Sequence, residues 1–280
     1  MRACCRSAAF CLLLVATPIP AAAWAARTHR LVTDLALDIL PGHCAATFRE
    51  HRRELLNRSV EPDTVLRERE GHREAIRHYI DLDAYMPYPF AGFPHSYRAA
   101  TKRYGRRTVE ERGLLPWVIL RLELELESAV RRGDTGAMLQ KAGYLSHYVA
   151  DAYQPLHLTA NHDGQKTGND GVHQRLEVGA VDDRIEQYGS ALRRHLPAVQ
   201  RVTNLRQELF DGFDRTYPLV ATILRADDEA RQAMGPPGPL YYRRMDAALH
   251  SAIERQLGTA ATLLASIWYT ACENGRPGPP

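Results

Sequence analysis

Cysteine, long apolar runs and excess charge are all scarce in this sequence of 280 residues. Beyond the amino-terminal segment, no stretch approaches the ~20 apolar residues that a membrane-spanning helix requires, which excludes an integral membrane segment there. The formal net charge is only +3, so overall electrostatics does not favour a polyanion as the partner. We find no convincing strand pair, repeat or heptad, and no persuasive Ser- or Cys-based catalytic triad.

The first 23 residues have the features of a secretory signal peptide. Basic residues near the start precede an apolar run at 8–16, and Ala21 and Ala23 occupy the positions that a signal peptidase recognises. We therefore expect cleavage before Trp24 and export of the mature protein, to the periplasm or outside the cell. The loss of two arginines leaves 34 basic residues against 33 acidic ones, a net charge of about +1.

Three of the five cysteines lie in this leader, so the mature chain keeps only Cys44 and Cys272. In an oxidising compartment, two thiols near opposite ends of a domain can form a disulfide that closes the fold. Two buried free cysteines are the alternative, and the sequence does not decide between them.

Helical periodicity dominates the mature chain and predicts an all-α protein, a single compact multi-helix domain over 24–272 with a disordered tail at 273–280. Between Tyr85 and Arg107 the periodicity is lost, and six aromatic residues alternate with prolines, glycines and basic residues. That segment is either a surface strap packed by its own aromatics, or a lid or substrate-binding wall. Helices are expected at 24–40, 45–56, 108–133 (opened by a Thr108/Glu111 capping box), from Asp134 onward, and at 185–196, 202–224 and 241–271.

Histidines and carboxylates concentrate between residues 143 and 177. His147 and Asp151 are four residues apart in a helical pattern, which places both side chains on one helix face. His157 follows just beyond the expected helix end at Pro155, and His173 and Glu177 repeat the four-residue spacing. Imidazole nitrogens and carboxylate oxygens suit Zn²⁺, and one tetrahedral zinc takes about four ligands. Five candidates here, with more upstream, therefore indicate more than one metal ion.

Nine positions in order and in approximate spacing resemble the superfamily of zinc-dependent phospholipases C and single-strand-specific trinuclear zinc nucleases. The stretches at 113–117 and 163–173 resemble a bacterial phospholipase C-like subgroup within it. The resemblance covers essentially the whole mature chain. Its residues are Trp24, His29, Asp63, His78, His147, Asp151, His157, His173 and Glu177.

The resemblance implies three zinc ions. One is expected at Asp63, His78, His147 and Asp151, a second at His157, His173 and Glu177, and a third at His29, Asp151 and the amino group and carbonyl oxygen of Trp24. Leader removal would then complete the site, because a free α-amine with a pKa near ~8 can lose its proton to bind metal.

The activity implied is phosphodiester hydrolysis, in which a zinc-bridging hydroxide attacks phosphorus in line. Asp151 is the expected bridging ligand, and Asp63 is expected to orient the attacking water or accept its proton. We expect a phospholipase C-like enzyme that acts as a monomer on phospholipid headgroups, with a nuclease acting on single-stranded nucleic acid as the alternative. A structural metal-binding protein without turnover is the third interpretation.

Overall fold

A computed structural model describes residues 24–276, and within this range the regular elements are all helices, with no strand. The predicted all-α fold is confirmed. The elements are α1 (Ala26–Ile39), α2 (Cys44–Glu50), α3 (Arg52–Arg58), η1 (Pro62–Leu66), α4 (Arg67–Glu70), α5 (His72–Ala75), η2 (Leu82–Ala84), α6 (Tyr97–Tyr104), α7 (Arg106–Glu111), α8 (Leu115–Arg131), α9 (Thr135–Ala152), η3 (Pro155–Leu158), α10 (Val172–Gln174), η4 (Arg175–Val181), η5 (Asp182–Arg184), α11 (Ile185–Leu192), α12 (Leu205–Thr216), α13 (Leu219–Met234) and α14 (Pro239–Gly275).

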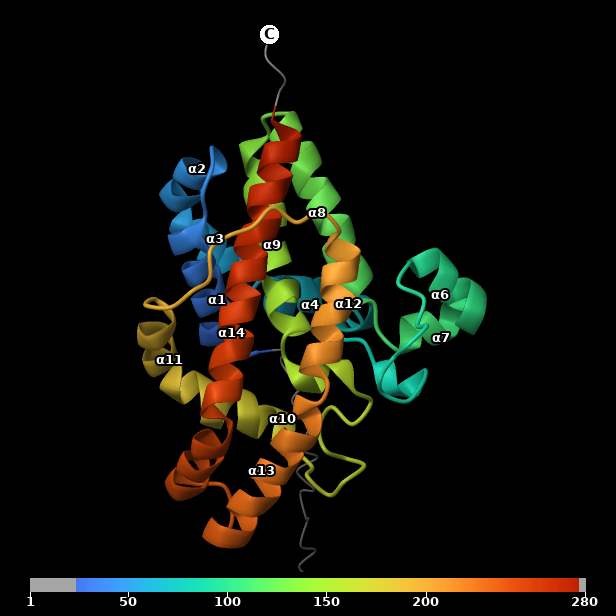
Figure 1. Cartoon of the computed structure of the whole chain (residues 1–280), viewed down its shortest axis with the longest axis vertical. Helices are drawn as coiled ribbons and strands as arrows, with labels where there is room; N and C mark the ends of the chain where they lie inside the picture. The colour runs from blue at the N-terminus through green and yellow to red at the C-terminus, as the bar shows by residue number, and fades with distance from the viewer. Residues whose placement is uncertain (1–23, 277–280) are drawn as a thin grey trace, which may run out of the picture.

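The long helix α14 runs through most of the molecule and organises the packing around it (Figure 1). It packs against α13, α8, α1 and α9. Its buried Trp268 makes an edge contact with Phe48 of α2, and its indole Nε1 donates to the Ala142 carbonyl of α9. Burial of such large aromatic side chains contributes strongly to the stability of the core.

Close contacts between α1, α3 and α9 fix the place where the candidate ligands meet. Gly143 allows α3 to approach α9, because a Cβ there would lie 2.4 Å from the Arg58 Cβ. Thr33 of α1 donates to Ser146 of α9 at 3.0 Å. These contacts place His29, one turn before Thr33, and the end of α3 beside the same turn of α9.

Cys44 and Cys272 form a disulfide, with their Cα atoms 6.1 Å apart. The bond joins the first residue of α2 to the last turns of α14, across 228 positions of sequence. Of the two alternatives left open by the sequence, the structure therefore contains the disulfide.

Three predicted helices are interrupted. The helix expected at 45–56 is divided at His51 into α2 and α3. The helix expected at 108–133 is α7 followed by α8, because Gly113 takes φ +94° where a Cβ would clash with the Tyr79 carbonyl oxygen. The helix expected at 202–224 is α12 and α13, divided at Pro218, where proline has no amide hydrogen to continue the first helix.

The end of the last helix differs from the prediction. The disordered tail was predicted from residue 273, but α14 continues through Gly275, so the predicted boundary is too early. The predicted signal peptide at 1–23 and the last residues, 277–280, lie outside the described residues. Within residues 24–276, no helix is both long and apolar enough to cross a bilayer.

The segment 85–107 contains a helix that was not predicted from the sequence, α6, whose cap residue Ser96 accepts from the Ala99 amide at 3.2 Å. Its aromatic side chains mostly pack on one another or on neighbouring helices. Tyr85 contacts Phe93 and Tyr104, and Tyr88 stacks on Tyr217 with ring centroids 5.6 Å apart. This packing favours the interpretation as a strap held by its own aromatics.

Candidate metal centre

The second half of α9 supplies the centre of the site. Asp134 caps the helix by accepting from the Ala137 amide at 3.0 Å, as predicted. Every residue from Leu145 to Ala152 is buried. His147 and Asp151 lie side by side, with His147 Nε2 3.4 Å from Asp151 Oδ2. An imidazole and a carboxylate are thus presented together inside the protein.

Asp63 and His78 come from outside α9 and complete a four-residue group with His147 and Asp151. In the five pairs other than Asp63 with Asp151, the ligand-type atoms of these side chains are separated by 3.0 to 3.8 Å. Two atoms bound at about 2.0–2.1 Å to one tetrahedral zinc lie roughly 3.3 Å apart. The spacing of this group therefore fits one zinc ion.

His157, His173 and Glu177 form a second group, although they belong to three different elements, η3, α10 and η4. His157 Nε2 lies 3.2 Å from His173 Nε2, and Glu177 Oε1 lies 2.9 Å from His173 and 3.6 Å from His157. η4 is a π-helical turn, as is η1, which carries Asp63. Such turns are frequent at functional sites.

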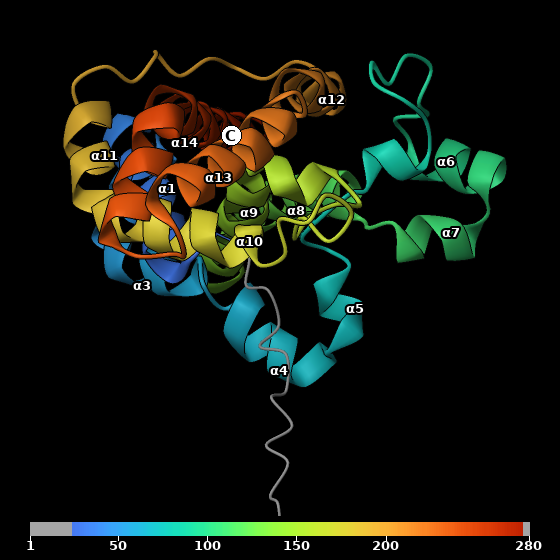
Figure 2. The same cartoon turned by 90° about the horizontal axis from the view of Figure 1, so that it is seen from below.

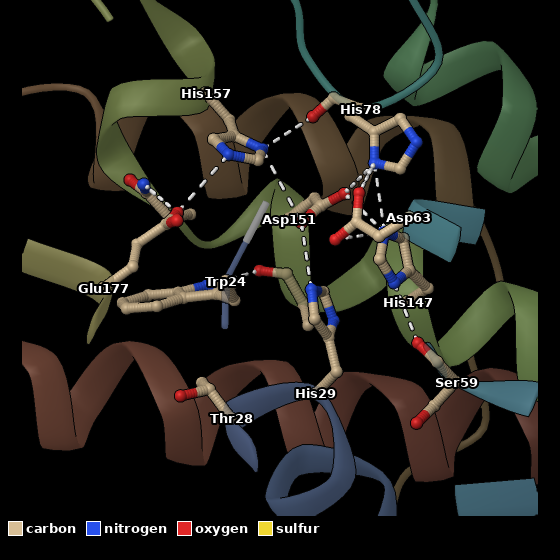
Figure 3. A network of polar contacts seen from close by, with 12 residues as sticks. Trp24, Thr28, His29, Ser59, Asp63, His78, His147, Asp151, His157 and Glu177 are labelled. Atoms are coloured by element: carbon tan, nitrogen blue, oxygen red, sulfur yellow. Dashed lines mark hydrogen bonds and ion pairs between the residues drawn. The ribbon is translucent and has the colours of Figure 1, made fainter. Parts of the chain in front are cut away.

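His29 and Trp24 lie on the remaining side of Asp151 (Figure 3). The His29 ring stacks on His147 with centroids 3.9 Å apart, and its Nε2 is 3.7 Å from Asp151 Oδ1. The buried indole of Trp24 donates to the Ala150 carbonyl at 3.0 Å. Asp151 thus offers Oδ2 to the first group and Oδ1 to His29, which is the geometry that a bridging carboxylate needs.

Backbone hydrogen bonds orient three of the histidines. The Nδ1 atoms of His147, His157 and His173 lie 2.8, 2.7 and 3.1 Å from the carbonyl oxygens of Ser59, His78 and His162 respectively. Because a carbonyl oxygen only accepts, each Nδ1 carries the hydrogen and each Nε2 keeps a free lone pair. Metal-binding histidines are typically held in this way.

Several buried polar atoms in the centre have no hydrogen-bond partner within the described part of the protein. They are Asp63 Oδ1, Asp151 Oδ1, His78 Nε2 and both ring nitrogens of His29. A buried polar group without a hydrogen bond costs free energy, and a buried charge costs more. Cations between these side chains would satisfy them, so the residues present fit metal ions.

The pKa values of three histidines and of Asp151 also fit metal binding. Burial, together with the neighbouring imidazoles, lowers the pKa of His29 and His78 well below the usual value. Burial lowers the pKa of His147 to about 3. Burial and the charges of Asp63 and Glu177 raise the pKa of Asp151 well above its usual value. His29, His78 and His147 are thus neutral and able to bind metal, whereas Asp151 lacks a positive partner. In the second group the ion pair outweighs burial, so Glu177 raises the pKa of His173 and His173 lowers the pKa of Glu177.

Two supporting residues were not predicted from the sequence. Gln154 is fully buried and donates from Nε2 to Glu177 Oε1 at 2.7 Å. Glu74 is buried against Arg77 and the Tyr148 hydroxyl, and its Oε1 lies 3.3 Å from His78 Nε2. Gln154 does not repeat a ligand spacing, whereas Glu74 stands four residues before His78, a spacing that was a usable signal.

A cavity of about 260 Å³ opens beside the centre. His78, His157 and His173 form part of its wall, and Arg67 and Asp81 add one charge of each sign. An Arg67 guanidinium nitrogen lies 3.7 Å from Asp63 Oδ1. A larger cavity of about 490 Å³ lies between Tyr153, residues 197–208 and α14, and it contains none of the candidate ligands. The smaller cavity is therefore the candidate substrate site.

Fold and site together define an all-α protein with three adjoining groups of metal-ligand side chains in its interior: His29, His147 and Asp151; Asp63, His78 and His147; and His157, His173 and Glu177. Eight of the nine predicted site residues belong to these groups, and Trp24 lies beside them, with its indole bonded to the Ala150 carbonyl. The groups are compatible with metal ions, while the number and identity of the ions, and each residue's role as a ligand, stay predictions.

No protein-family model and no curated protein matches this chain in sequence. In structure it is similar to the alpha toxin of Clostridium absonum, with a TM-score of 0.50 and 12% identity, over 88% of this chain and 63% of the toxin chain. It is also similar to a Clostridium perfringens alpha-toxin isolated from avian strain SWCP, with a TM-score of 0.51 and 13% identity, over 88% of this chain and 64% of the toxin.

The chain thus spans less than two thirds of the length of either toxin. At this level of identity the similarity shows the fold alone. The fold that the family resemblance predicted is therefore confirmed.

Proposed function

We propose that this protein is an exported zinc-dependent phosphodiester hydrolase of the phospholipase C type. The observation that carries the proposal is the meeting of three groups of ligand atoms in one buried centre beside a cavity. Bound zinc ions would supply Lewis-acid polarisation of phosphate oxygens and a water of lowered pKa. The proposed ligand sets are those that the resemblance implies, with Asp151 shared between two ions and the Trp24 main chain at one of them.

The chain's own residues would bind and orient the substrate. Arg67, in the cavity wall, is placed to pair with a phosphate oxygen. Asp63 has a side chain 15% exposed, more than any other proposed side-chain ligand, so it is the carboxylate best placed to accept a proton from an attacking water. The Nε2 atoms of His147, His157 and His173 are held toward the centre by the backbone bonds of their Nδ1 atoms.

The packing of the segment 85–107 favours a phospholipid over single-stranded nucleic acid. Proteins that bind single strands use free aromatic faces on which bases stack. Here Tyr85, Phe93 and Tyr104 pack against one another, and Tyr88 stacks on Tyr217. Tyr88, 47% exposed, and Tyr97, 37% exposed, are the partly free rings of the segment, and each also contacts another ring, Tyr217 or Trp117.

The proposal predicts that purified mature protein hydrolyses phosphatidylcholine faster than single-stranded DNA or RNA. The three substrates are incubated in parallel with zinc and with excess chelator, and phosphorylated products are quantified. Chelator should abolish the activity. Faster cleavage of nucleic acid would establish the nuclease alternative. Metal binding without any hydrolysis would support the interpretation as a structural metal-binding protein.

A further inference from the structure

Helices α6 and α7 form a lobe, residues 97–112, that stands apart from the helical body in both views (Figures 1 and 2). The base of the lobe is joined to the wall of the metal-centre cavity. The Asp81 amide donates to the Arg112 carbonyl at 2.8 Å, and the Tyr79 hydroxyl lies 3.4 Å from the Glu111 carbonyl oxygen. Tyr79 and Asp81 both line that cavity. The lobe is therefore attached directly beside the site.

The positive charge of the mature protein is concentrated in this lobe. Residues 97–112 contain six basic and two acidic side chains. Since the chain predicted to remain after leader cleavage has 34 basic and 33 acidic residues, everything outside the lobe has 28 basic against 31 acidic. A strongly basic lobe thus projects from an otherwise slightly acidic protein.

Arg98 and Lys102 are the lobe's most available cations. Arg106 and Arg107 pair with Glu110 and Glu111 on α7. Arg98 and Lys102 are exposed, and neither forms a salt bridge with any described residue. They stand four residues apart on α6, so they lie on the same helix face.

We propose that the α6–α7 lobe docks on membranes that contain anionic phospholipid and so brings the cavity to the lipid headgroups, an inference that rests on the proposed phospholipase C-like function. Basic side chains near an anionic bilayer are attracted without any specific contact, and several of them act together. Nucleic acid would also attract them. Of the lobe's two aromatic rings, Tyr104 packs on Tyr85 and Phe93, and Tyr97 is 37% exposed with an edge contact to Trp117. One partly free ring is little for stacking bases, which favours the membrane.

The test is flotation of zinc-loaded mature protein with vesicles of phosphatidylcholine alone or with about 30% phosphatidylglycerol at ~0.1 M salt. The variant Arg98→Glu/Lys102→Glu should bind the anionic vesicles at least about tenfold more weakly than the parent protein. The matched control is Arg225→Glu/Arg243→Glu, which makes the same charge change on α13 and α14 at exposed residues without salt bridges to described residues. The control should bind like the parent. Equal binding by the lobe variant and the parent would overturn the proposal.

Two further measurements separate this proposal from the proposed function. Hydrolysis of a water-soluble short-chain phosphatidylcholine should be unchanged in the lobe variant, whereas hydrolysis of anionic vesicles should fall with binding. If the parent binds vesicles, the lobe variant does not, and the parent hydrolyses no lipid, the docking proposal is supported and the proposed enzymatic function is wrong. If the variant loses single-stranded DNA binding in a filter assay while vesicle binding is unchanged, the lobe binds nucleic acid and the membrane proposal is wrong.

Discussion

Asp151→Asn should lower phosphodiester hydrolysis by roughly a hundredfold or more and release at least one zinc ion. The substitution keeps the size of the side chain but removes the charge that faces two ligand groups, with Oδ2 3.4 Å from His147 Nε2 and Oδ1 3.7 Å from His29 Nε2. An amide cannot offset two dications. The measurements are zinc per chain by elemental analysis and the initial rate with excess zinc.

The matched control for this variant is Asp227→Asn. Asp227 is also a fully buried carboxylate, but it pairs with Arg175 and Arg231, outside the candidate centre. That variant should lose stability and keep its zinc. Circular dichroism establishes whether each variant is folded. A folded Asp151→Asn protein with full metal content and a normal rate would disprove the bridging role.

One extra residue before Trp24 should nearly abolish hydrolysis while the protein still folds. If Trp24 is the first mature residue, its amine and carbonyl can chelate zinc in a five-membered ring, with His29 as a third donor. Peptide-bond formation converts that amine into an amide, which is a very poor ligand at neutral pH. The burial of Trp24 and the bond from its indole to the Ala150 carbonyl keep the residue beside Asp151.

The comparison uses correctly processed protein and the same protein with one added residue, matched by circular dichroism and assayed in excess zinc. The extended protein should contain less zinc than the processed one. Equal rates with equal zinc content would mean that Trp24 is a packed aromatic residue without a role in metal binding.

Local spacing explains which parts of the site were predictable. His147 with Asp151, and His173 with Glu177, stand four residues apart in helical segments, so their adjacency follows from helix geometry. The meeting of Asp63 and His78 with α9 depends on tertiary packing, and only the family resemblance indicated it. Gln154 was missed because its role depends on the position of Glu177, which belongs to another element.

The fold class was also predictable from local spacing, whereas the boundaries of the helices were not. Apolar periodicity predicts helices but does not detect an interruption that depends on a distant residue. Gly113 breaks the expected helix where it abuts the Tyr79 carbonyl oxygen, a contact between segments far apart in sequence. In the segment 85–107, the Ser96 cap was a local signal for α6 that the aromatic and proline content obscured.

The most direct test of the account is the zinc content of correctly processed protein, measured together with phosphatidylcholine hydrolysis as zinc is added back after chelation. The account predicts saturation at three zinc ions per chain, with hydrolysis that depends on them. One zinc per chain at saturation, or hydrolysis that survives complete zinc removal, would contradict it.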